Sequence, residues 1–70
     1  MNDTFESVTS LRARLDVLLS EHRDLDDAIT RLHERPPTDE LLVRRLKKRK
    51  LFIKDRILLI ERLLDPDELA

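Results

Sequence analysis

The chain has 70 residues, of which 41% are charged and 3% aromatic, and it contains neither glycine nor cysteine. The lack of cysteine excludes disulfides and thiolate metal sites, and a chain this short buries too small a fraction of its surface to support a comfortable core alone. We therefore expect self-association to supply the missing support. Long solvated helices need neither glycine turns nor aromatic packing, so the expected fold class is all-α.

A first helix is predicted over residues 4–35. Its apolar residues recur alternately four and three positions apart, which is the spacing of a heptad seam. Polar residues interrupt this seam at Thr4 and His22. The seam positions are Thr4, Val8, Leu11, Leu15, Leu18, His22, Leu25, Ile29 and Leu32.

A turn is predicted at residues 36–38, because Pro36 and Pro37 lack backbone donors and disfavour helical conformation in the residue before each of them. Thr38 is expected to cap a second helix over residues 39–64, whose acidic first turn suits the positive end of the helix dipole. A short acidic tail at residues 65–70 follows, so the chain is expected to be a single hairpin domain over residues 1–70. The second seam comprises Val43, Leu46, Lys50, Ile53, Ile57, Ile60 and Leu64.

The short connection favours an antiparallel, coiled-coil-like pair of helices. In the predicted register, the paired seam residues extend from Leu32 opposite Val43, beside the turn, to Leu11 opposite Leu64. This register also brings opposite charges together along both flanks of the seam. The four expected pairs are Asp26 with Lys47, Arg12 with Glu61, His33 with Glu40, and Glu21 with Arg56.

Apolar residues beyond the seam predict an interface between copies of the chain. Leu19 and Phe5 remain uncovered on the first helix, and a larger group remains on the second. A surplus of this kind on a hairpin marks an association surface, although simple exposure is the alternative. Packing two hairpins would give a four-helix bundle, so a dimer or tetramer is expected. The predicted interface residues are Leu51, Phe52, Leu58, Leu59 and Leu63.

The basic stretch at residues 44–50 has two interpretations. Clustered lysine and arginine are typical of proteins that bind phosphate backbones, and the exposed candidates would be Arg44, Arg45, Lys48 and Lys54. Solvated or structural charge is the favoured interpretation, because no aromatic residue lies there to stack on bases. A second alternative is an anionic membrane surface bound by the basic and apolar residues 47–64.

Two polar residues on the seam are expected to set the register. His22 and Lys50 each occupy a position that is otherwise apolar, where a polar residue fixes register or oligomeric state. Asp26 is the expected partner of the Lys50 ammonium group, whose stem can lie along the seam. For His22 the alternative is a pH-sensitive contact with Glu21 or Asp55. No metal site is expected, because His22, Asp26 and His33 do not converge.

Catalysis and membrane insertion find no support in the sequence. The serine, threonine and histidine residues give no support to nucleophilic catalysis, and phosphate-binding loops of the glycine-rich kind need glycine, which the chain lacks. The first residues lack the character of a secretory signal, and the apolar stretches are far shorter than a membrane span. We therefore expect a cytoplasmic, non-enzymatic protein without a cofactor.

Particular residues of both helices resemble the YdcH-like family, a group of small bacterial proteins of unknown function. They are Leu18, His22, Leu25, Asp26, Ile29 and Leu32, followed by Leu46, Lys47, Lys48, Lys50, Leu51, Lys54 and Asp55. The resemblance covers roughly residues 11–62, and it implies a bacterial cytoplasmic helical hairpin. It implies no activity, ligand or catalytic residue. The double proline and the Arg44–Arg45 extension depart from the family pattern.

Overall fold

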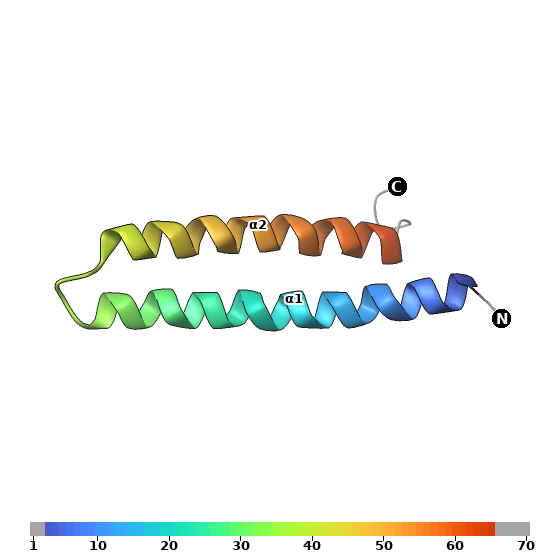
Figure 1. Cartoon of the computed structure of the whole chain (residues 1–70), viewed down its shortest axis with the longest axis horizontal. Helices are drawn as coiled ribbons and strands as arrows, with labels where there is room; N and C mark the ends of the chain where they lie inside the picture. Colours follow the sequence, from blue (N-terminus) through green and yellow to red (C-terminus); the bar gives the residue numbers. More distant parts are fainter. Residues whose placement is uncertain (1–2, 66–70) are drawn as a thin grey trace.

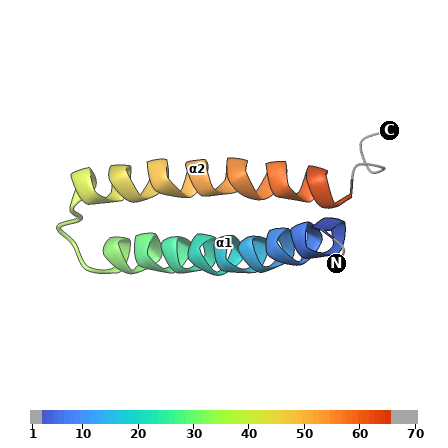
Figure 2. The same cartoon turned by 45° about the vertical axis from the view of Figure 1, so that its right-hand side comes forward.

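The computed structural model describes residues 3–65, with side chains from Glu6 onward, and it consists of two antiparallel helices. Helix α1 spans Asp3–Glu34 and helix α2 spans Glu40–Leu64. Figures 1 and 2 show the two helices side by side along their whole shared length, with one turn between them. The molecule measures 55 × 27 × 15 Å, so it is elongated and flat. These observations confirm the predicted all-α hairpin.

The turn between the helices follows from its two prolines and from one aspartate. Helix α1 ends at Glu34, shortly before Pro36 and Pro37, and α2 begins at Glu40. The cap of α2 is Asp39, not the expected Thr38: its backbone is extended, and its carboxylate accepts a hydrogen bond of 3.0 Å from the backbone N–H of Leu42. The helix therefore begins one residue later than expected, because Asp39 can reach the amide three residues further on.

The core is a narrow seam between the two helices. Five apolar side chains are buried among residues 6–65, all of them at positions of the predicted seams: Ile29, Val43, Ile53, Ile57 and Ile60. Ile53 is completely buried. Four of the five belong to α2. The remaining seam residues of the described part are half-buried, apart from Val8.

Val8 was assigned to the seam, but its side chain is exposed. In the predicted register Leu11 already faces Leu64, the last residue of α2. A residue three positions before Leu11 therefore extends beyond the end of α2 and has no helix opposite it. The predictions for Thr4 and Phe5 concern side chains outside the described residues, and most of the predicted acidic tail likewise lies outside them.

Among the residues that the structure describes, two ion pairs link the helices, and they differ in part from the four expected pairs. Asp26 bonds Lys50, as predicted for the Lys50 ammonium group, and does not pair with Lys47; Glu21 bonds Arg49 rather than Arg56. Lys50 lies on the seam whereas Lys47 flanks it, and Arg49 lies about two helical turns nearer to the hairpin turn than Arg56, on the same side of the helix. Both pairs are compatible with the predicted register to within roughly one to two helical turns.

The other two expected pairs lie at the two ends of the hairpin. Arg12 and Glu61 line one shallow depression at the open end, and His33 and Glu40 line another beside the turn. Neither forms an ion pair within the part of the chain that the structure describes.

Candidate association surface

The flat hairpin has two broad faces, one on each side of the seam. Because successive residues of a helix are about 100° apart, Phe52, Leu59 and Leu63 lie to one side of the α2 seam, and Leu51 and Leu58 lie to the other. We call the first side the Phe52 face and the second the Lys50 face. Each face also carries residues of α1 and one of the two ion pairs that link the helices.

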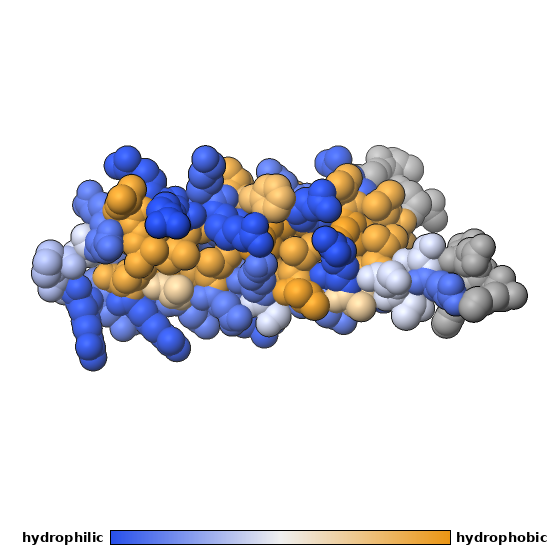
Figure 3. Space-filling model, viewed as in Figure 1, coloured by the Kyte–Doolittle hydropathy of each residue, from blue (hydrophilic) through white to orange (hydrophobic). Residues whose placement is uncertain are grey.

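The Phe52 face is organised around Arg49. Its guanidinium group donates to both carboxylate oxygens of Glu21, at 3.4 and 3.3 Å, and lies 5.5 Å from the centre of the Phe52 ring. Val17 lines a depression together with Glu21 and Arg49, which places Val17 on the same face. Its side chain is 66% exposed. Figure 3 shows hydrophobic side chains of both helices in a band along one broad face, interrupted by charged groups.

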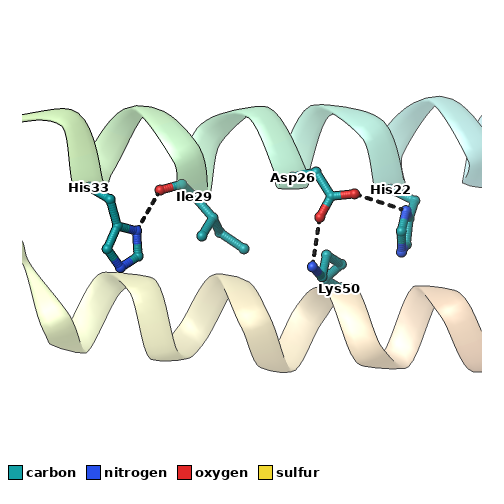
Figure 4. Close-up of polar contacts among 5 residues, drawn as sticks. All are labelled: His22, Asp26, Ile29, His33 and Lys50. Atoms are coloured by element: carbon teal, nitrogen blue, oxygen red, sulfur yellow. Dashed lines mark hydrogen bonds and ion pairs between the residues drawn. The ribbon is translucent and has the colours of Figure 1, made fainter.

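The Lys50 face carries a cluster of polar contacts, shown in Figure 4. Lys50 Nζ donates to Asp26 Oδ1 at 2.6 Å, and Asp26 Oδ2 lies 3.6 Å from His22 Nδ1. The hydrogen bond from Lys50 holds the pKa of Asp26 below its ordinary value, and the positive charge of Lys50 acts in the same direction. This arrangement is the one expected for Lys50, whose ammonium group leaves the seam toward Asp26.

His22 and His33 take separate partners. His22 is half-buried beside Asp26, one helical turn away on the same helix. His33 Nδ1 donates to the backbone oxygen of Ile29 at 2.9 Å. The alternative partners considered for His22, Glu21 and Asp55, do not form ion pairs with it among the described residues. No group of three or more potential metal ligands occurs within residues that the structure describes.

All five predicted interface residues are exposed in the isolated hairpin. The structure divides them between the two broad faces instead of gathering them in one patch. Val17 and Leu41 were not singled out from the sequence, yet both are exposed and apolar. The available signal was the apolar character of both residues at positions outside the predicted seams.

The basic stretch is spread around α2. Arg44, Arg45, Lys48 and Lys54 are all exposed. The helical rotation places Arg45 on the Phe52 face, Arg44 and Lys54 on the Lys50 face, and Lys48 along the outer edge. They therefore do not line a single groove. Neither helix, within the described residues, is long and apolar enough to cross a membrane.

Comparison with known proteins identifies a family without assigning an activity. Residues 15–61 match the model of a family described as "Protein of unknown function (DUF465)". The match covers most of both helices and confirms the resemblance to YdcH-like proteins. No curated protein and no solved structure matches the chain.

Proposed function

The chain belongs to the DUF465 family, whose function is unknown, and from this premise we propose that it is a non-enzymatic helical module that associates with further copies of itself. The observation that carries the proposal is the set of large apolar side chains left exposed on both helices. They are Val8, Val17, Leu19, Leu41, Leu51, Phe52, Leu58, Leu59 and Leu63.

The small core supports the same conclusion. The five apolar side chains buried among residues 6–65 form one seam, and two helices alone leave no second layer to cover the other apolar residues. Burial of apolar surface stabilises by about 25 cal/mol for each Å², so covering these side chains with another copy contributes directly to folding. Domains of this length commonly gain stability in this way.

Light scattering at several protein concentrations tests the proposal. We expect a mass of two or four chains that falls toward one chain on dilution. A mass of one chain at every concentration, up to the millimolar range, would contradict self-association.

A second candidate function is binding to phosphate backbones through Arg44, Arg45, Lys48 and Lys54, all of which are exposed. Such binding would weaken steeply as salt is raised, because bound phosphates release their counterions. The variant Arg45→Glu with Lys48→Glu should abolish it in a gel-shift titration with duplex DNA or RNA. Absence of a shift for the native protein at low salt would eliminate this candidate.

A further inference from the structure

The Phe52 face gathers arginines that are far apart in the sequence. Within the described residues, helical rotation places two arginines of α1 and three of α2 on this side of the seam. All five are exposed. They are Arg14, Arg31, Arg45, Arg49 and Arg56. The lysines of α2, by contrast, lie on the Lys50 face or along the outer edge.

The carboxylates of the Phe52 face leave it with an excess of positive charge. Among residues 6–65 its acidic side chains are Glu21 and Asp24, so five cations face two anions. Glu21 is bonded to Arg49, and the other four arginines form no ion pair within the part of the chain that the structure describes. A guanidinium group can bind a phosphate through two parallel hydrogen bonds. The charge of this face therefore favours an anionic partner that carries phosphates.

One depression joins cations of both helices to an aromatic ring. Arg14 of α1 and Arg49 of α2 line it together with Val17. Arg49 also lies over the ring of Phe52, which is 54% exposed. Unpaired bases stack on exposed aromatic rings and on guanidinium planes. Phosphate-binding groups and a stacking platform thus lie side by side in a site that neither helix makes alone.

We propose that the Phe52 face binds single-stranded nucleic acid, with its arginines on the phosphates and Phe52 against an unpaired base. This inference rests on the second candidate function, from which it keeps Arg45 and to which it adds residues of α1. A single strand fits better than a duplex, whose bases are already stacked on one another. A bilayer fits less well, because Arg14, Arg49 and Arg56 lie beside the seam, along the middle of the face, where insertion would bury their charges.

Fluorescence anisotropy tests the proposal with a labelled polyuridine strand of about 20 nucleotides and the full chain. We expect binding that weakens as salt is raised. The slope of log affinity against log salt should be no steeper than about −3.5, because each of up to five phosphate contacts on a single strand contributes about −0.7.

Matched pairs of substitutions test which face binds. Arg45→Gln with Arg56→Gln should raise the dissociation constant at least about tenfold and flatten the salt slope by about 1.4, because two phosphate contacts are lost. The control is Arg44→Gln with Lys54→Gln, which also removes two exposed positive charges from α2, but on the Lys50 face. It should leave the dissociation constant within about threefold of the native value.

Phe52→Leu tests the stacking contact. Leucine keeps an apolar side chain at this position but cannot stack on a base, so the dissociation constant should rise at least about fivefold with little change in the salt slope. Circular dichroism of each variant shows whether it remains helical. An unchanged affinity in a helical Phe52→Leu variant would contradict the stacking role.

The results separate this inference from the proposed functions. A native chain that binds neither single strands nor duplexes at low salt overturns both the inference and the second candidate function. An equal loss of affinity in the two pairs, or tighter binding to a duplex than to the single strand, overturns the inference alone. So does retention on phosphatidylserine vesicles without binding to the strand. Light scattering without nucleic acid tests self-association independently of these outcomes.

Discussion

The carboxylate of Asp26 contacts both polar residues of the seam, Lys50 and His22. It accepts a hydrogen bond from Lys50 on the other helix and lies beside His22 on its own. A charge on an apolar seam is tolerated here because the lysine stem packs while the ammonium group reaches an exposed partner. The pair therefore favours one register, and its net contribution to the free energy of unfolding is limited by exposure to water.

The lowered pKa of Asp26 predicts how acid acts on the hairpin. The ordinary value is 3.8 and the folded value is lower, so the unfolded chain binds the proton more readily. The contribution of this carboxylate is present above pH 3.8 and is lost as the pH falls through the folded pKa. We expect thermal unfolding to show the native protein more stable than Asp26→Asn at about pH 6, with the difference shrinking below about pH 3. A constant difference across this range would contradict the assignment.

Ile53 is expected to be the most sensitive apolar position, because its side chain is completely buried. Ile53→Ala should lower the free energy of unfolding by about 2–5 kcal/mol, which is enough to unfold much of a small hairpin. Urea denaturation followed by circular dichroism measures this change. The control Leu51→Ala removes a side chain that is exposed, and should change stability by less than about 0.5 kcal/mol if that residue stays outside every interface.

At the scale of elements, substitutions at the start of α2 compare the observed cap, Asp39, with the expected one, Thr38. Asp39→Ala removes the acceptor of the Leu42 amide and should lower the free energy of unfolding by about 1 kcal/mol. Thr38→Ala leaves that hydrogen bond intact and should cost clearly less. Chemical denaturation of both variants gives the comparison, and an equal or larger loss in Thr38→Ala would contradict Asp39 as the cap.

Heptad spacing predicted the helices and the seam because burial on one side of a helix follows directly from sequence period. The prolines likewise predicted the turn. The sequence did not settle which of two neighbouring cations Asp26 would pair with, since Lys47 and Lys50 were both expected within its reach. Nor did a list of surplus leucines reveal that they lie on two faces. That distinction depends on their rotation relative to the seam and on residues of α1 such as Val17.

At the scale of the whole molecule, folding and association are expected to be coupled. Binding of a second copy to the folded hairpin, but not to the unfolded chain, raises the apparent stability of the folded state by mass action. The thermal midpoint should therefore rise by several degrees when the protein concentration is raised about tenfold or more. The Phe52→Asp and Leu59→Asp variant should show a midpoint that does not change with concentration. A concentration-independent midpoint in the native protein would indicate that the hairpin folds alone.

The hairpin also gives the molecule two unlike poles. The start of α1 and the end of α2 lie together at one pole, and the turn forms the other (Figure 1). Anything fused to either helix at that shared pole, such as a fluorescent protein or an affinity tag, would crowd one tip and leave the proline-bearing tip unobstructed. If the turns of a dimer point the same way, four such attachments would cluster within a few helix diameters, which makes energy transfer between fused fluorophores an accessible signal of assembly in living cells.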